Sequence, residues 1–425
     1  MPHKKITADS PITDIALPKK VIIPMQQHIG APCQPIVARG DEVKVGQVIG
    51  DSEAYVSAPI HSSVSGKVLS VGPMPYPGGG SVIAVEIESD GLQTIHESVV
   101  PHTFNDKKEF LALVRASGLV GLGGAGFPGH VKLNPQNQIM TLIVNAAECE
   151  PYITSDYRAI LENAENIIEG IKLVKEVLEI DDVCLGIEDN KPEAAKYFDD
   201  LVANDPELRV TVLPSVYPQG AEKMLIYACT GKKVPPGKLP ADVGTVVLNV
   251  NSLALIAEYI HTGMPLVSKT VTVSGSAVKK PMNLKVPIGT PLSELFDFCE
   301  GFSSEPHKVL MGGPMMGIAQ HSFDVPVIKN TNAVLAFDEA EATMLPETSC
   351  IRCGKCVENC PMHLMPLILN MAAVKNDLER LESFHIMDCV ECGTCVYNCP
   401  AKRRIVQSVR LGKSALRSAK AKEGK

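Results

Sequence analysis

The first hundred residues alternate short apolar runs with turns. Between residues 30 and 72, β-branched runs of four to six residues are separated by Gly-Asp, Gly-Gln and Ser-Gly pairs, and another apolar run covers residues 82–88. Short strands with turns at such close spacing are typical of a small β barrel or sandwich. We therefore expect a β module in residues 1–100.

Residues 101–265 have a different pattern, in which continuous apolar runs alternate with runs of helical periodicity. Strand–helix alternation of this kind predicts a mostly parallel sheet with helices on both faces. The expected strands are 140–145, 183–187, 210–213 and 245–250, and the expected helices are 106–116, 159–178, 191–202 and 222–230.

The last third of the chain divides into two further units and a tail. Residues 266–345 begin as strand, Gly turn, strand and helix, and continue into a loop-rich stretch. Residues 346–410 contain a spacer at 362–388 that has helical periodicity, and residues 411–425 form a basic tail. The fold class that these patterns predict is a multidomain α/β protein.

Composition and charge exclude some function classes. The chain has 425 residues, a net charge of −8, 4% aromatic residues and no Trp. Nucleic-acid binding is therefore not expected, because it needs basic excess and stacking side chains. The most apolar stretch, residues 245–260, is interrupted by Asn249, Asn251 and Glu258. We expect no membrane span and no signal peptide. In a reducing cytoplasm disulfides are rare, so the 13 Cys favour metal ligation.

Eight of these cysteines form two copies of one motif, C-x2-C-x2-C-x3-C-P, whose copies are 39 residues apart. This spacing is typical of bacterial two-cluster ferredoxins, in which three close Cys bind one cluster and the Cys before Pro binds the other. We therefore expect two [4Fe–4S] clusters; zinc and disulfides are weaker alternatives, because zinc sites usually use two Cys pairs. One cluster would be held by Cys350, Cys353, Cys356 and Cys399, and the second by Cys389, Cys392, Cys395 and Cys360.

The remaining five cysteines have no ligand spacing. Free Cys is often a small buried apolar residue, which is the expectation for four of them. Cys149 is set apart by a resemblance described below. The five are Cys33, Cys149, Cys184, Cys229 and Cys299.

A Gly-rich segment at residues 121–128, GLGGAGFP, formally contains G-x-G-x-x-G. The dinucleotide fingerprint needs a strand immediately before these glycines, and the preceding segment has the pattern of a helix and turn. A conventional Rossmann site is therefore disfavoured. Four Gly in six residues still expose backbone N–H groups that can approach an anion closely.

Five segments in order carry a family resemblance. GLGGAGFPGHVK, NAAECEP, YPQGAE, VPPGKLPADVG and LNVNSL begin at residues 121, 145, 217, 234 and 248. This series resembles the flavin-binding, NADH-oxidising subunit of respiratory complex I. The N-terminal module, with PIHSSVSG from residue 59, resembles the barrel-sandwich hybrids of biotinyl and lipoyl carriers without their carrier Lys.

The domain order extends this resemblance to nearly all of residues 15–415. The segment at 266–302 resembles the soluble-ligand-binding β-grasp (SLBB) module, and the two-cluster segment resembles an α-helical ferredoxin. The whole arrangement is similar to the RnfC subunit of the Rnf electron-transport complex.

The resemblance implies an FMN and NADH site. The residues that it implies for FMN are Gly121, Gly123, Gly124, Gly126, Lys132, Asn145, Glu148, Tyr217, Gly220, Asn249, Asn251 and Ser252. For NADH it implies Phe127, Glu150 and Glu222. The chain departs from the complex I pattern at Leu122, Ala147, Cys149 and Ala221, and the resemblance places the Cys149 thiol beside the flavin.

The resemblance also implies a function. It is that of a peripheral electron-transfer protein on the cytoplasmic face of the cell inner membrane, which passes electrons between NAD(H), FMN and two [4Fe–4S] clusters. Its partners would be the other Rnf subunits and, through them, ferredoxin, with coupling to Na⁺ or H⁺ transport. The alternatives are a cobalamin reductase of the propanediol-utilisation type, and a scaffold with an inactive flavin site whose clusters only relay electrons. The net charge of +8 in residues 401–425 suits either the negative clusters or an acidic partner.

Overall fold

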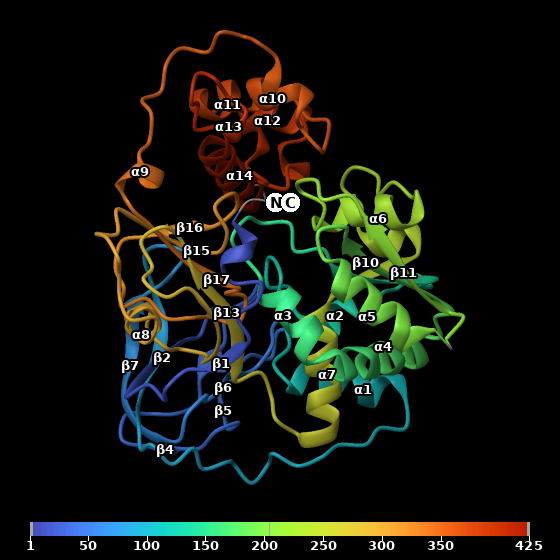
Figure 1. The fold of residues 1–425 in the computed structure, drawn as a ribbon, viewed down its shortest axis with the longest axis vertical. Helices are drawn as coiled ribbons and strands as arrows, with labels where there is room; N and C mark the ends of the chain where they lie inside the picture. Colours follow the sequence, from blue (N-terminus) through green and yellow to red (C-terminus); the bar gives the residue numbers. More distant parts are fainter. Residues whose placement is uncertain (1–2, 204, 423–425) are drawn as a thin grey trace.

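The computed structural model describes residues 3–203 and 205–422 (Figure 1). The N-terminal module consists of two facing antiparallel sheets, ordered β2-β8-β7-β4 and β3-β5-β6. Apolar side chains from both sheets, such as Ile23, Ile49 and Val85, share one core. The strands predicted within residues 30–72 and 82–88 are confirmed, and the module contains one further strand, β2, which precedes the predicted ranges. In chain order the strands of the module are β2 (Lys20–Pro24), β3 (Gln34–Pro35), β4 (Glu42–Val43), β5 (Val48–Asp51), β6 (Ile60–His61), β7 (Gly66–Pro75) and β8 (Ser81–Ser89).

The next unit is a four-stranded parallel sheet in the order β11-β10-β9-β12. Strands β9, β10 and β11 lie side by side in chain order, and β12 lies on the other side of β9. This strand order resembles that of one half of a Rossmann fold. The parallel sheet predicted from strand–helix alternation is confirmed. The strands are β9 (Thr141–Ala146), β10 (Asp182–Glu188), β11 (Leu208–Leu213) and β12 (Thr245–Asn249).

Helices cover both faces of this sheet because its side chains alternate in direction. Leu142 and Val144 belong to the core that includes Ile171 of α4 and Leu253 of α7, whereas Ile143 packs with Leu225 of α6. The helices are α1 (Lys107–Ala116), α2 (Gly129–Lys132), α3 (Ser155–Glu162), α4 (Ala164–Leu178), α5 (Pro192–Val202), α6 (Glu222–Thr230) and α7 (Val250–Thr262), with a short helix η2 (Pro240–Val243) before β12.

One helix prediction in this unit is wrong. The single helix expected at 159–178 is two helices, α3 and α4, interrupted at Asn163, whose backbone angles (φ −139°, ψ 28°) are not helical. The Asn163 side chain accepts a hydrogen bond from Asn166 Nδ2 at 2.7 Å. Asn often interrupts or begins helices because its side chain makes local hydrogen bonds of this kind.

The third unit is a six-stranded sheet in the order β1-β14-β13-β17-β15-β16. Strand β1 lies far from the others in the sequence but pairs in parallel with β14. The N-terminal segment therefore contributes to this sheet before the chain enters the N-terminal module. The elements are η1 (Lys4–Ile6), β1 (Ile12–Asp14), β13 (Ser268–Ser274), β14 (Met282–Pro287), α8 (Leu292–Phe298), β15 (Lys308–Met311), β16 (Ile318–Gln320), β17 (Ala333–Phe337) and α9 (Glu339–Ala342).

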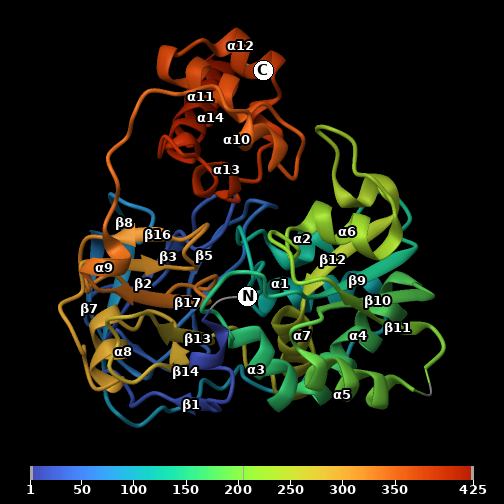
Figure 2. The same ribbon diagram turned by 45° about the horizontal axis from the view of Figure 1, so that its top comes forward.

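The C-terminal unit is helical, as predicted for the spacer at residues 362–388. An extended segment after α9 leads to it, and Figure 2 shows these helices above the sheets. The elements are α10 (Lys355–Glu358), α11 (Pro366–Lys375), α12 (Leu378–Ser383), η3 (Ile386–Asp388), α13 (Thr394–Tyr397) and α14 (Ile405–Lys422). Residues 423–425 of the predicted tail lie outside the described residues. Among the described helices, none is long and apolar enough to cross a membrane.

Candidate functional site

The Gly-rich loop lies against the carboxyl end of the parallel sheet. Gly121 N donates to Phe127 O at 2.9 Å, which closes the loop. A Cβ on Gly123 would lie 2.9 Å from Nδ2 of Asn249, the last residue of β12, whereas a Cβ on Gly124 would meet nothing within 4 Å. Parallel sheets bind ligands at this edge, where the strand order reverses. Here the reversal lies between β9 and β12, and the loop precedes β9 instead of following it.

Three predicted site residues come together with one residue that the sequence did not single out. Asn249 Nδ2 and Asn251 Nδ2 donate to the two carboxylate oxygens of Asp156 at 2.6 and 2.7 Å. Burial, and then Glu148, raise the pKa of Asp156. Ser252 is buried on α7 next to this group. No local pattern identifies Asp156, because its role depends on the tertiary contact with β12.

Asn145, at the end of β9, connects to the loop before α6. Its Nδ2 donates to Gly220 O at 3.0 Å, and its Oδ1 accepts from Ala147 N at 3.1 Å. A Cβ on Gly220 would lie 2.2 Å from Ala147 O, so only Gly fits there. Cys149 lies beside Gly220, and burial raises its pKa to about 12, so its thiol stays protonated.

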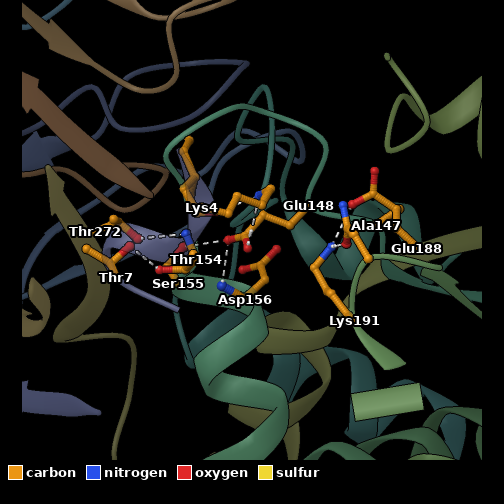
Figure 3. A network of polar contacts seen from close by, with 12 residues as sticks. Lys4, Thr7, Ala147, Glu148, Thr154, Ser155, Asp156, Glu188, Lys191 and Thr272 are labelled. Atoms are coloured by element: carbon orange, nitrogen blue, oxygen red, sulfur yellow. Dashed lines mark hydrogen bonds and ion pairs between the residues drawn. The ribbon is translucent and has the colours of Figure 1, made fainter. Parts of the chain in front are cut away.

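Glu148 is the centre of a buried polar network (Figure 3). Its Oε1 accepts from Asp156 N at 2.8 Å and from Ser155 Oγ at 3.2 Å. Its Oε2 has no hydrogen-bond partner among the described residues, although Lys4 Nζ lies 3.7 Å away. A buried carboxylate needs such a countercharge, because burial of an ion without one is costly in free energy.

A second buried ion pair lies at the same edge of the sheet. Lys191 Nζ contacts Glu188 Oε2 at 2.6 Å, and Glu188 Oε1 has no hydrogen-bond partner among the described residues. This pair was not predicted from the sequence. The sequence did contain a signal for Glu188, because this residue directly follows the strand predicted at 183–187. Ligand-binding residues of parallel sheets lie at that end of the strands.

Two more predicted residues connect this edge to other units, Glu150 to the six-stranded sheet and Tyr217 to the C-terminal unit. Glu150 accepts from Met315 N at 3.0 Å and from Met316 N at 2.9 Å, and burial raises its pKa. Tyr217 OH lies 3.4 Å from Glu150 Oε1 and donates to Cys392 O at 2.7 Å. The loop of a predicted cluster ligand therefore contacts the candidate site directly.

The remaining predicted residues are Gly126, Phe127, Lys132 and Glu222. Lys132 Nζ forms an ion pair with Glu222 Oε1 at 2.5 Å, and Phe127 is half-buried near the end of the Gly-rich loop. Gly126 has a positive φ of 71°, which favours Gly at that position. The structure thus brings the residues implied by the resemblance to one edge of the sheet.

The eight motif cysteines line two cavities in the C-terminal unit, four in each. The first cavity is lined by Cys350, Cys353, Cys356 and Cys399, and the second by Cys360, Cys389, Cys392 and Cys395. This grouping has the crossed form that the spacing predicts; ligation itself stays a prediction.

The chemistry of these cavities fits [4Fe–4S] clusters. Backbone N–H groups donate to the sulfurs of Cys350, Cys389 and Cys399 at 3.4 Å each, and such bonds tune cluster potentials. Within the described residues, no group of three His, Cys, Asp or Glu side chains is arranged to hold a single metal ion. A cubane does not require that, because each thiolate binds a different iron.

The basic helix α14 packs against the second cavity. Lys413 Nζ donates to Cys389 O at 2.6 Å and to Glu391 Oε1 at 2.7 Å, and Arg410 also pairs with Glu391. These cations therefore lie beside the cysteine loop, where they would offset the negative charge of a cluster.

Comparison with known proteins identifies the family. The chain is 47% identical to the RnfC subunit of the proton-translocating ferredoxin:NAD⁺ oxidoreductase complex of Clostridium ljungdahlii, over 99% of this chain and 93% of the relative. It is 46% identical to the corresponding subunit of the Na⁺-translocating complex of Acetobacterium woodii, over 97% and 94% of the two chains. The chain belongs to the RnfC family of the Rnf ion-translocating ferredoxin:NAD⁺ oxidoreductases. Its partners therefore include other subunits of an Rnf complex.

Four domain families match this Rnf protein in chain order. They are described as RnfC Barrel sandwich hybrid domain (residues 1–92), Nuo51 FMN-binding domain (114–258), SLBB domain (270–319) and 4Fe-4S dicluster domain (349–404). The predicted family and multidomain α/β fold are confirmed. The domains imply FMN and two [4Fe–4S] clusters as cofactors.

A solved structure shares the fold of the Rnf protein. This is the NAD⁺-reducing [NiFe]-hydrogenase in the H2-reduced state, with a TM-score of 0.50 and 18% identity, over 76% of this chain and 67% of the hydrogenase chain. At this identity the likeness concerns the fold alone.

Proposed function

We propose that this chain passes electrons between NAD(H) and two [4Fe–4S] clusters by way of FMN bound at the carboxyl edge of the β9–β12 sheet. The observation that carries the proposal is the hydrogen bond from Tyr217 OH to Cys392 O, 2.7 Å long. It joins a residue of the candidate flavin site to the backbone of a candidate cluster ligand. A flavin exchanges two electrons with NAD(H) and single electrons with clusters, which is the chemistry needed at such a junction.

The Gly-rich loop and the ends of β9 and β12 supply the flavin-binding groups. Gly123 and Gly124 are exposed, and the space beside Gly124 is open. Asn145, Asn249 and Asn251 lie at the adjoining strand ends. The residues that we propose for FMN are Gly121, Gly123, Gly124, Gly126, Lys132, Asn145, Glu148, Tyr217, Gly220, Asn249, Asn251 and Ser252.

The residues Phe127, Glu150 and Glu222 are proposed for NADH. Glu150 is held in place by backbone N–H groups of Met315 and Met316, so its carboxylate is oriented before any ligand binds. Such preorganisation reduces the entropy that binding must overcome.

The two clusters have different surroundings, which indicates an order for electron transfer. The cavity of Cys360, Cys389, Cys392 and Cys395 adjoins Tyr217. In the other cavity Cys350 and Cys353 are exposed. We propose that the cluster beside Tyr217, held by Cys360, Cys389, Cys392 and Cys395, exchanges electrons with FMN, and that the other cluster exchanges electrons with a partner protein of the complex.

The proposed electron transfer takes place within an Rnf complex. We propose that the chain is peripheral, on the cytoplasmic face of the inner membrane, and that ferredoxin exchanges electrons with it through other Rnf subunits. The names of the two relatives above mention protons and Na⁺, respectively. The transported ion is proposed to be one of these two.

Replacing Tyr217 with Phe tests the junction. Losing one hydrogen bond, worth about 0.5–1.5 kcal/mol, is expected to slow electron transfer from FMN to the clusters about 2- to 13-fold, which is more than it slows FMN reduction by NADH. Stopped-flow visible spectra under anaerobic conditions follow both events in one trace. Tyr227→Phe, at an exposed Tyr, is the matched control. An unchanged rate of cluster reduction in Tyr217→Phe would contradict the proposed contact.

A further inference from the structure

The N-terminal segment at residues 3–10 packs beside the candidate flavin site. The ring of His3 stacks on Tyr152, with ring centres 4.4 Å apart, and Thr7 Oγ1 lies 2.7 Å from Thr154 Oγ1. Asn283 Nδ2 donates to Thr7 O at 2.9 Å and to Ser10 O at 3.1 Å. Contacts with both the α/β unit and the six-stranded sheet therefore hold this segment in one position.

Lys4 is the residue of this segment that reaches the site. Its side chain is 11% exposed, and its ammonium donates to Ile153 O and lies 3.7 Å from Glu148 Oε2 (Figure 3). Glu148 Oε2 has no hydrogen-bond partner among the described residues. In the described part of the chain, Lys4 supplies the salt-bridge contact to this buried oxygen, although 144 residues separate the two in the sequence.

The surroundings of Glu148 contain buried cations as well as buried anions. Burial lowers the pKa of Lys269, whose Nζ has no hydrogen-bond partner within the described residues, while Asp156 and Glu148 oppose that shift. The cations are Lys4, Lys191 and Lys269, and the anions are Glu148, Asp156 and Glu188. Removing one cation leaves a buried negative charge uncompensated, which is strongly unfavourable.

We propose that Lys4 is a positioning residue of the FMN site, which holds the Glu148 carboxylate in the orientation in which its Oε1 accepts hydrogen bonds from Ser155 Oγ and Asp156 N. This inference rests on the proposed function, because it assumes that the site containing Glu148 binds FMN. It makes docking of the N-terminal segment a condition for flavin binding.

The test is FMN titration of flavin-free protein with intact clusters. Lys4→Met keeps the length of the side chain and removes its charge, and about 10- to 100-fold weaker FMN binding is expected. Lys4→Arg should bind FMN nearly as well as the unmodified chain. Lys5→Met, at the exposed neighbouring Lys, is the control and should bind FMN normally.

A double variant separates positioning from general destabilisation. In Lys4→Met/Glu148→Gln both charges are gone, so its FMN affinity should match that of Glu148→Gln alone, because coupled residues are not additive. If Lys4→Met does not fold, the double variant should restore folding. With saturating FMN, Lys4→Met should also show a more negative flavin potential, because an uncompensated carboxylate opposes added electrons.

The outcomes distinguish the two proposals. If the unmodified chain binds no FMN, the proposed function fails. If the unmodified chain binds FMN and Lys4→Met binds it equally well, the role of Lys4 is wrong. Two further outcomes would overturn it. One is a double variant whose loss of FMN affinity equals the sum of the losses in Lys4→Met and Glu148→Gln. The other is a double variant that stays unfolded.

Discussion

Replacing Cys360 with Ser removes one of the two clusters, and the cluster that is lost is the one bound by the second motif. Iron content is expected to fall from about eight to about four per chain. The physical reason is that Cys360 lines a cavity with Cys389, Cys392 and Cys395 instead of its sequence neighbours. Iron and sulfide analysis of anaerobically purified protein measures the effect, with Cys299→Ser, in the buried core near α8, as the control.

Double variants show which cluster has been lost. Cys360→Ser/Cys392→Ser should keep about four irons, because both changes affect one cluster. Cys360→Ser/Cys353→Ser should keep almost none, because each change affects a different cluster. The opposite pattern would mean that each motif binds its own cluster, and the crossed assignment would be wrong.

Replacing Gly124 with Val abolishes most FMN binding without destabilising the chain. A Cβ there meets no atom within 4 Å, so the free energy of unfolding should change by less than about 0.5 kcal/mol. If the flavin occupies this open space, Val blocks it, and FMN should bind at least about 100-fold more weakly; the smaller Gly124→Ala should show an intermediate loss. FMN fluorescence titration and thermal unfolding measure the two quantities.

A matched control exists on strand β7. A Cβ on Gly72 also meets nothing within 4 Å, and Gly72 lies in the N-terminal module, away from the Gly-rich loop. Gly72→Val should therefore bind FMN normally. If Gly124→Val also binds FMN normally, the flavin does not lie over the Gly-rich loop.

The sequence predicted those features that depend on local spacing. The strands and helices of the α/β unit follow from periodicity, except for the break at Asn163, where one side-chain hydrogen bond interrupts an otherwise continuous amphipathic pattern. The motif spacing predicted which cysteines share a cavity, because the ferredoxin arrangement is encoded in the number of residues between ligands.

Features that depend on tertiary contacts were not predicted. Lys4 and Asp156 have no distinguishing neighbours in the sequence, and their roles appear only when η1 packs beside Glu148 and α3 packs beside the end of β12. The place of the Gly-rich loop was predicted only in part. The helix before it is confirmed, but the pattern did not show that the loop folds back to the strand-order reversal used by Rossmann folds.

The central claim is that NADH reduces both clusters of this chain through FMN. The most direct measurement is an anaerobic titration of cluster-containing protein with NADH, followed by visible and electron paramagnetic resonance spectra, with and without FMN. We expect about eight irons and one FMN per chain, and we expect NADH to reduce the clusters only when FMN is bound. Cluster reduction that is equally fast without FMN, or a flavin that NADH cannot reduce, would contradict this claim.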